Sequence, residues 1–390
     1  MNSLAKQVLA FFNSLRLTVA LLILSILLVF AATLDQVHLG VWGVQEKYFR
    51  SFFIFAQLRG TGLSVPIFPG GYLIGALLLP NLVVAHFMRF RWSAGKTGIW
   101  LTHIGLILLL VGQGLSGILQ KDNQIRFDIG QTRRYSESFR ETELALVEVT
   151  NPESNRVVAV PVSALERKET IQHPWLPFTV RPVAFYPNAL LRARSQMPSP
   201  LPSLATAGVG PEVAVEPAAV TYKSDEVNFP TAYIELVGPE GSLGTYLVST
   251  MMVEPQAVTY LGRTWRISLR PERDYFPFTL TLKKFTHDIY PGTDIPKDFA
   301  STIQLRSDDK HDDREVRIYM NNPLRYGGRA FYQAGYANND RTTVLQVVSN
   351  PSWLVPYISC ALIAVGLAVE FGMHLLKYFR RRPATRASSP

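Results

Sequence analysis

The sequence predicts a membrane protein with four transmembrane α-helices and a large β-rich domain, a sandwich or an open barrel, between the third and fourth helices. A helix needs ~20 apolar residues to cross a bilayer. The chain has 390 residues and contains four apolar runs near that length. The stretch 120–350 instead contains short segments rich in β-branched and aromatic residues, separated by proline, glycine, asparagine or aspartate. We therefore expect a membrane anchor and an external domain in one chain.

The apolar runs divide the chain into spans and loops. The first run, Leu17–Thr33, could be mistaken for a signal peptide. However, no small-residue cleavage site follows cleanly after AATLDQVHLG, and more spans come later, so we expect a retained anchor. The expected layout is an N-terminal tail (1–16), four spans (17–33, 72–88, 98–119 and 353–376), an external loop (34–71), an inner loop (89–97), the external domain (120–350) and a basic tail (377–390).

The basic residues predict the orientation. Segments 1–16, 89–97 and 377–390 hold ten lysines and arginines and no acidic residue, which leaves 29 basic against 30 acidic residues elsewhere. The formal charge of +9 therefore lies where the positive-inside rule expects cytoplasm. We expect both termini in the cytoplasm and the large domain on the other side. Because this topology accounts for the charge, we expect no nucleic-acid partner.

The external domain has the pattern of an antiparallel β-protein. Segments such as STIQLRS and EVRIYMN alternate apolar and polar residues, as strands with one buried face do. Many short strands at this spacing favour a sandwich or an open barrel. Residues 191–220 are rich in proline and alanine without periodicity, so we expect a mobile excursion there. The only cysteine, Cys360, lies in the fourth span, so the chain cannot itself be a thiol oxidoreductase.

One titratable residue interrupts the third span. His103 lies about six residues from its cytoplasmic end, roughly 9 Å deep at 1.5 Å per residue. Ionisable residues at such depth are rare and usually face a partner, a cavity or a cofactor. The position is compatible with a neutral histidine bonded to a neighbouring helix and with an iron ligand.

Two other histidines lie at a similar level, near the inner ends of their spans. They are His86 in the second span and His374 in the fourth. Glu370, four residues before His374, shares its helix face, so an interfacial position or an ion pair is the favoured interpretation. The alternative is that both histidines contribute to a cofactor site.

Small and polar residues predict contacts between the helices. Gly98, Gly105 and Gly112 recur every seven residues in the third span, which lets another helix approach closely. We expect that helix to belong to the same bundle rather than to a second protein. Asn81 beside Pro80 predicts an interhelical hydrogen bond and a kink.

No catalytic motif accompanies these features. The sequence has no Walker motif, no GxSxG and no specific pair of carboxylates, so we assign no catalytic residue. The histidines outside the expected spans lack metal-ligand spacing such as HxxxH; they are His38, His173, His287 and His311.

Two consecutive segments resemble a known family. KFTHDIYPGTDIPKDFASTIQL (284–305) and VRIYMNNPLRYGGRAFYQAGY (316–336) are similar to the signature of the ResB (CcsB) family of cytochrome c biogenesis proteins. The membrane layout resembles that family as well, with SLRLTVALLIL in the first span, NLVVAHFMRFR closing the second and a histidine in the third. The resemblance covers most of the chain.

The resemblance implies a function in haem handling at the bacterial inner membrane, with the large domain on the periplasmic side. ResB-like proteins form a complex with a second membrane protein, CcsA (ResC). The complex carries haem across the membrane for thioether attachment to CxxCH motifs of apocytochrome c, whose cysteines other thiol-reducing proteins keep reduced. A transmembrane histidine of the ResB half is implicated as a haem ligand, and His103 in WLTHIGL matches it. The tryptophan-rich haem-presenting motif belongs to CcsA and is absent here, so we expect a separate partner.

The resemblance also implies roles for the second signature segment. Its residues either contact the partner or apocytochrome, or they only build a turn and a strand. The residues that match are Asn321, Asn322, Pro323, Leu324, Tyr326, Gly327, Tyr332 and Gln333.

Two other classes of function stay open at this point. The chain could be a membrane-anchored β-domain that scaffolds another assembly, with His103 merely packed. It could also be a quinone- or haem-based redox protein, which would titrate reversibly without maturing cytochromes. In a haem-delivery complex the chain would be a non-redox subunit.

Overall fold

The computed structural model describes residues 3–57, 63–89, 93–151, 154–197, 202–222, 226–292, 296–307, 309, 311–338 and 340–381. The chain forms two compact units. The helical unit comprises Met1–Gln120, Tyr222–Asp225 and Asn350–Pro390, and the β unit comprises Lys121–Thr221 and Glu226–Ser349. Among the described residues, four helices are long and apolar enough to cross a membrane, and the antiparallel β unit lies between the third and fourth of these in the sequence. The predicted fold class is confirmed.

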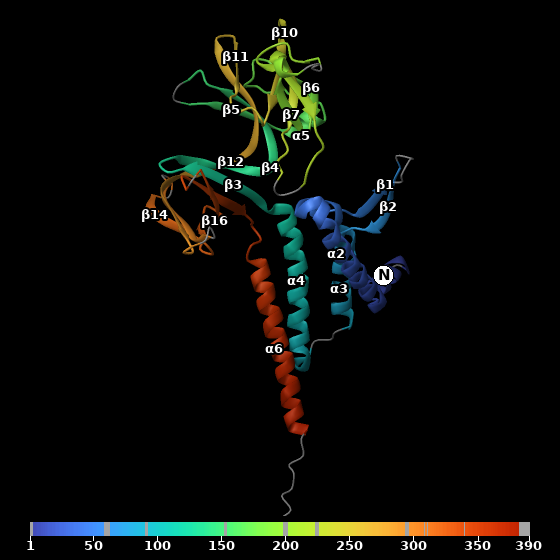
Figure 1. The fold of residues 1–390 in the computed structure, drawn as a ribbon. Helices are drawn as coiled ribbons and strands as arrows, with labels where there is room; N and C mark the ends of the chain where they lie inside the picture. The colour runs from blue at the N-terminus through green and yellow to red at the C-terminus, as the bar shows by residue number, and fades with distance from the viewer. Residues whose placement is uncertain are drawn as a thin grey trace, which may run out of the picture. The chain divides into compact units, whose positions relative to one another are not determined.

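The helical unit contains the four spans and a small hairpin (Figure 1). The spans are α2 (Leu15–Val44), α3 (Gly71–Arg89), α4 (Thr97–Leu119) and α6 (Val355–Arg381). The other elements are α1 (Ser3–Phe12), η1 (Gln45–Phe49), β1 (Phe53–Gln57), β2 (Ser64–Pro69) and η2 (Ala94–Lys96). Residues 90–92 of the expected inner loop and 382–390 of the expected basic tail lie outside the described residues, so those parts of the layout stay predictions.

The first span is longer than its apolar run. α2 continues to Val44, so the expected external loop 34–71 begins inside a helix. At about 1.5 Å per residue its 30 residues extend beyond the ~30 Å hydrocarbon core. Polar residues end a membrane span without ending a helix: Asp35 Oδ2 lies 2.6 Å from Lys47 Nζ and accepts a hydrogen bond from Tyr48. Gly40, at φ 70° and ψ 169°, interrupts the helix near its end.

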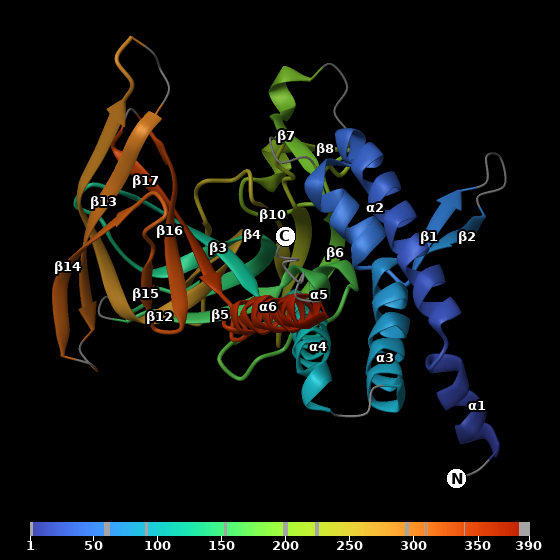
Figure 2. The same cartoon turned by 90° about the horizontal axis from the view of Figure 1, so that it is seen from below.

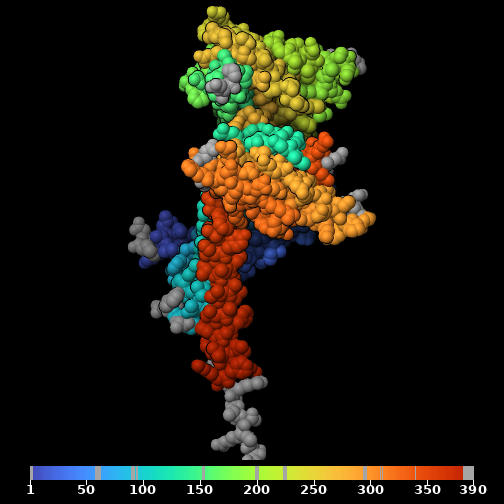
Figure 3. Space-filling model, turned by 90° about the vertical axis from the view of Figure 1, so that its left-hand side faces the viewer, coloured from blue at the N-terminus to red at the C-terminus, as the bar shows by residue number. Residues whose placement is uncertain are grey.

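The glycines of α4 pack against α6, as their spacing predicted. A Cβ added at Gly98 would lie 2.7 Å from the backbone nitrogen of Glu370. One at Gly112 would lie 2.5 Å from Val355, so the two helices run antiparallel at close range. Figure 3 shows α6 in front of the other helices. Large apolar side chains of α6 are exposed, as expected of a helix in contact with lipid, including Val365 and Phe371.

Asn81 connects α3 to the N-terminal helices. Its side chain is fully buried, donates to the carbonyl oxygens of Phe12 and Ser14 at 2.7 and 3.2 Å, and accepts from Thr18 at 2.7 Å. The predicted interhelical hydrogen bond is confirmed.

The β unit is built on an antiparallel ten-stranded sheet. The order along it is β14-β13-β12-β4-β3-β17-β16-β15, with β11 on β12 and β5 on β4. Its strands are β3 (Lys121–Asp128), β4 (Thr132–Glu148), β5 (Arg156–Pro161), β11 (Gln256–Tyr260), β12 (Arg263–Ile289), β13 (Pro296–Ser307), β14 (Asp312–Tyr319), β15 (Leu324–Tyr326), β16 (Arg329–Ala337) and β17 (Thr342–Ser349). β14 contacts β15 and β16 at the other end, so this part is nearly barrel-shaped (Figure 2).

Smaller elements complete the β unit. They are a three-stranded sheet in the order β10-β9-β6, a pair β7-β8, and the short helix α5 (Val162–Glu166). Their strands are β6 (Thr179–Tyr186), β7 (Ala189–Ala193), β8 (Val213–Pro217), β9 (Thr231–Gly238) and β10 (Gly241–Ser249). The short 3₁₀ helices are η3 (Arg194–Gln196) and η4 (Gly210–Glu212).

β12 contributes to the two largest apolar cores in the described part of the β unit. In one, Trp265 of β12 packs with Ile234 of β9, so two sheets face each other as in a sandwich. In the other, Phe276 and Phe278 of β12 pack with Phe331 inside the nearly closed barrel. The two architectures expected as alternatives therefore occur side by side along one long strand.

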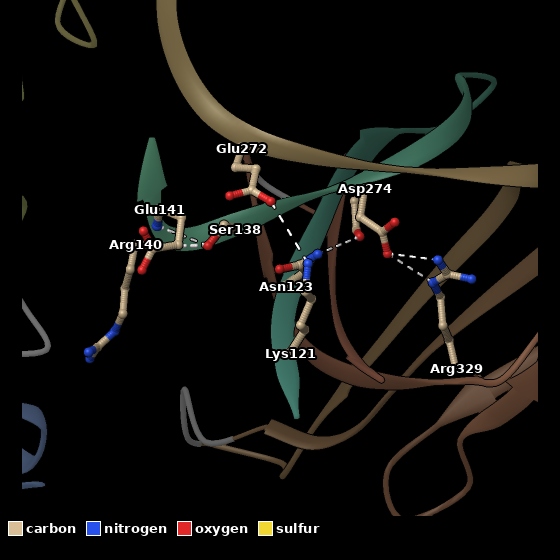
Figure 4. A network of polar contacts seen from close by, with 9 residues as sticks. Lys121, Asn123, Ser138, Arg140, Glu141, Glu272, Asp274 and Arg329 are labelled. Atoms are coloured by element: carbon tan, nitrogen blue, oxygen red, sulfur yellow. Dashed lines mark hydrogen bonds and ion pairs between the residues drawn. The ribbon is translucent and has the colours of Figure 1, made fainter. Parts of the chain in front are cut away.

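Charged pairs link strands of the sheet between these cores. Arg270 on β12 bonds Glu143, the residue opposite it on the neighbouring strand β4, at 2.8 Å, with both side chains largely buried. A cross-strand pair of opposite charge stabilises this register. Figure 4 shows two further pairs, which link strands that are not adjacent in the sheet: Asp274 on β12 accepts two hydrogen bonds from Arg329 on β16, and Lys121 on β3 lies 4.0 Å from Glu272 on β12.

The expected mobile excursion 191–220 differs from the structure. It carries the end of β7, η3, η4 and all of β8. Ala205 and Val215 are buried against Tyr233 and Leu247. Small alanine and valine side chains can be buried from short strands and coil, which leave no periodic pattern to detect. Residues 198–201 of this stretch lie outside the described residues.

Candidate functional site

Two of the three predicted inner histidines meet between α3 and α4. The rings of His86 and His103 are nearly parallel, at an angle of 18° with centroids 5.2 Å apart. Trp100 lies three residues before His103 on α4. Its ring is edge-on to that of His86, with the two ring centroids 4.0 Å apart, and the ring centroid of Phe87 lies 5.9 Å from that of Trp100. We call these four residues, His86, Phe87, Trp100 and His103, the histidine cluster.

Hydrogen bonding defines the tautomer of His103. Its Nδ1 lies 2.8 Å from the carbonyl oxygen of Ile99. A carbonyl oxygen only accepts, so Nδ1 donates and carries the proton. In a neutral imidazole the lone pair is then on Nε2, which is the ring atom through which this tautomer would bind a metal. Metal-binding histidines commonly donate their other ring N–H to a backbone carbonyl in this way. The chemistry of His103 therefore fits an iron ligand.

The histidine cluster does not form a pair of axial ligands. Two imidazoles on opposite sides of one iron point their nitrogens at it edge-on, with ring centres about 6 Å apart. The rings of His86 and His103 are stacked, with centroids 5.2 Å apart, which is closer than the rings of such a pair. His86 is only 1% exposed, and its ring packs against that of His103.

His374 lies outside the histidine cluster. Its Nε2 is 3.0 Å from Glu370 Oε1, one turn earlier on α6, and its side chain is 66% exposed. This is the pair that the i, i+4 spacing favoured. His374 therefore has Glu370 as its partner and is not part of the histidine cluster.

The asparagines of the family signature form a turn between β14 and β15. Asn321 has φ 61°, a left-handed conformation that asparagine tolerates better than most residues. Asn322 exchanges backbone hydrogen bonds with Tyr319 at 3.0 and 3.4 Å. Gly327, at φ 57°, approaches Phe278 so closely that an added Cβ would lie 2.8 Å from that ring. Asn321, Asn322 and Gly327 therefore stabilise the turn, and all three are exposed.

The remaining signature residues line or support the barrel. Gln333 accepts from Ser301 at 2.6 Å and donates to Thr343 at 2.9 Å, which ties β16 to β13 and β17. Leu324 is part of the core, and Tyr326 packs edge-on against Phe278 at 4.9 Å. Pro323 and Tyr332 are half-buried. The structural interpretation of this signature is supported, and contact with a partner stays a prediction for its exposed residues.

Sequence reasoning missed Trp100 and Phe87 as neighbours of the histidines. The spacing of Trp100 and His103 in IWLTH places both on one face of α4, which was a usable signal. The approach of α3 to α4 at His86 had no such signal, because it depends on how the two helices cross.

Comparison with known proteins places this architecture in a family. Residues 90–344 match the ResB-like family. The chain belongs to the ResB-like family. The match includes α4 with His103 and nearly all of the β unit, whereas His86 and His374 lie outside it.

One curated relative gives a further comparison. The chain is 24% identical over 306 residues to Protein NrfI of Wolinella succinogenes. The aligned region covers 76% of this chain and 29% of NrfI, so the chain spans less than a third of the length of that relative.

Proposed function

We propose that this ResB-like protein is a subunit of a membrane complex for cytochrome c biogenesis that delivers haem for thioether attachment to CxxCH motifs of apocytochrome c. Membership of the family supports the biogenesis role. The observation that carries the haem step is the hydrogen bond from His103 Nδ1 to the Ile99 carbonyl, which directs the metal-binding lone pair to Nε2 within an apolar span.

Haem is the cargo in this proposal, and His103 holds it by one axial bond. The iron of haem takes two axial ligands. The stacking of His86 on His103 favours a different source for the opposite ligand. A histidine of a CcsA-like partner, a separate membrane protein, supplies it instead. The haem is thus shared between two polypeptides and is retained only when both are present.

The other residues of the histidine cluster position the ligand. His86 and Trp100 pack against each other, and His86 stacks on His103, so the imidazole of His103 has few orientations available. The apolar side chains of α4 keep water from the iron while haem is held. The β unit holds the partner, the apocytochrome or both after haem has moved outward.

The test is haem occupancy of the complex purified with its CcsA-like partner. We expect His103→Ala to abolish haem copurification. His103→Gly should behave likewise and should regain the haem absorption spectrum when imidazole is added. His374→Ala is the matched control, because it removes a histidine at a similar level from outside the cluster, and it should keep its haem. Unchanged haem occupancy in His103→Ala would remove the role assigned to this residue.

The second candidate function is a scaffold without haem binding. It is favoured by the finding that the family signature builds a turn and the barrel. A colourless complex with normal partner binding would support it. A quinone- or haem-based redox protein would instead titrate reversibly while cells lacking it still mature their cytochromes.

A further inference from the structure

The hairpin β1–β2 of the helical unit presents apolar side chains outward. Phe53, Phe55 and Ile67 are 46%, 56% and 62% exposed. The inward side is packed: Ile54 is 4% exposed, and Phe68 packs against the same apolar cluster. Isolated two-stranded hairpins are marginally stable in water, and contiguous exposed apolar surface usually marks an interaction site.

The base of the hairpin is fixed at the ends of two spans. It follows η1 at the end of α2 and leads directly into α3. Gly70 donates to the Phe52 carbonyl oxygen at 2.8 Å, and Tyr72 donates to that of Ser51 at 3.2 Å. At Gly70 an added Cβ would lie 2.1 Å from the Ser51 carbonyl oxygen, so the two ends of the hairpin are in close contact. The hairpin therefore starts after η1, whose Lys47 and Tyr48 bond Asp35 just past the apolar run of α2, and it ends just before the first residue of α3.

Charge distribution separates the hairpin from the helix end beside it. The end of α2 and η1 carry the ion pairs Asp35–Lys47 and Glu46–Arg50. The described strand residues, 53–57 and 64–69, carry no ionisable side chain. A water-facing antiparallel sheet normally alternates apolar and polar residues, and its outward face is polar. This one is apolar on the outward face as well.

The chain's own helices leave that face uncovered. In Figures 1 and 2 the hairpin projects from α2 and α3 on the side away from α4. Aromatic residues flank it, with Phe52 and Tyr72 in ring contact at 5.9 Å. Aromatic side chains are enriched where membrane proteins cross the boundary between headgroups and acyl chains.

We propose that the hairpin β1–β2 is an interfacial membrane anchor, with Phe53, Phe55 and Ile67 inserted among the lipids of the leaflet where α2 ends and α3 begins. The partner is the lipid surface itself. Because the described strands are uncharged, the contact is with the acyl boundary of any phospholipid and does not need anionic headgroups. The hairpin would hold the outer ends of α2 and α3 at a constant depth.

Spin labelling of the full chain in phosphatidylcholine nanodiscs tests this proposal. Cys360→Ser removes the only cysteine, and Phe53→Cys, Phe55→Cys or Ile67→Cys then carries a nitroxide label, one site at a time. Because these three sites are exposed, labelling them leaves the packing of Ile54 and Phe68 against the helices unchanged. Val365→Cys on the exposed side of α6 is the lipid reference, and Ser242→Cys on β10 is the water reference.

We expect oxygen to relax the nitroxides at the three hairpin sites more strongly than a water-soluble nickel chelate does. The lipid reference at position 365 should show the same order. The reverse order, as at position 242, would overturn the proposal. Shielding from both reagents would also overturn it, because the face would then be covered by protein, such as a second copy. No haem enters the measurement, so its outcome is separate from that of the proposed function.

Discussion

At the scale of single residues, the ligand chemistry of His103 depends on one backbone carbonyl and one neighbouring ring. The bond from Nδ1 to Ile99 selects the tautomer, and the stack with His86 restricts the plane of the imidazole. Preorganised ligands bind metal more tightly than free side chains because less freedom is lost on binding. His86 is therefore a positioning residue in this account and His103 is the ligand.

Substitutions at His86 separate these two roles. His86→Phe keeps an aromatic ring against His103 but has no nitrogen, so the complex should keep its haem and its absorption spectrum. His86→Ala removes the ring, so haem occupancy should fall while the spectrum of the haem that remains is unchanged. The readouts are the ratio of haem to protein and the visible spectrum. If His86→Phe loses haem as completely as His103→Ala, His86 is itself a ligand.

The sequence could predict part of this site. A histidine within an apolar run is conspicuous, so His103 was identifiable from composition alone. Its pairing with His86 was not, because contact between two spans depends on their crossing angle and rotation. The Glu370–His374 pair was predictable, since both residues belong to one helix with fixed geometry.

At the scale of elements, the contact between α4 and α6 depends on glycine. A Cβ at Gly105 would lie 2.6 Å from Ile363 and 2.9 Å from the carbonyl oxygen of Ser359. We expect Gly105→Val to push the helices apart and to lower the thermal midpoint of the purified chain by several degrees. Gly114→Val is the matched control on the same helix, because nothing lies within 4 Å of its added Cβ. Equal effects of the two substitutions would contradict this packing.

The charged pairs between β4 and β12 make a second element-scale prediction. Removing one partner of a buried pair leaves an uncompensated charge, so Glu143→Ala should destabilise the β unit by about 3 kcal/mol. The double variant Glu143→Leu with Arg270→Met should recover most of that loss. Arg167→Ala, in the exposed pair with Glu169, should cost less than about 1 kcal/mol. Chemical denaturation followed by tryptophan fluorescence measures all three, and equal losses at Glu143 and Arg167 would refute the role of burial.

A neighbouring pair shows why such groups stay charged. Burial lowers the pKa of Arg273, but the nearby Tyr135 and Glu137 together outweigh it, so the pKa of Arg273 is raised. Its guanidinium group lies 4.1 Å from the centre of the Tyr135 ring and 2.9 Å from Glu137. The positive charge of Arg273 therefore persists where β12 passes from one core to the other.

The membrane spans could be predicted from the sequence because a single physical quantity limits their length. The continuation of α2 and the packing of residues 191–220 could not. Bilayer thickness sets the length of an apolar run, so the spans were located from composition. The continuation of α2 beyond Asp35 was missed because its polar residues pair with η1 instead of ending the helix. The packed stretch 191–220 was missed because alanine and valine in short strands give no periodicity.

At the scale of the whole molecule, the proposed orientation depends on the basic segments. We expect the inner loop and both termini to face the cytoplasm and the β unit to lie on the periplasmic side of the inner membrane. In the Cys360→Ser background, a membrane-impermeant maleimide should label Ser242→Cys in intact spheroplasts. Ser93→Cys, in the inner loop, should react only after permeabilisation. The opposite pattern of labelling would reverse the topology.

We propose that this chain supplies one of the two ligands of the haem iron, His103, and that the partner supplies the other. Substitution of His103 by methionine tests this most directly. The complex with the CcsA-like partner is purified with His103→Met, which substitutes a thioether for an imidazole ligand. Replacing histidine by methionine on haem iron raises the reduction potential. The account predicts that the haem of this variant has a higher potential and an altered absorption spectrum. A variant that binds haem with the potential and spectrum of the unsubstituted complex would show that His103 does not bind the iron.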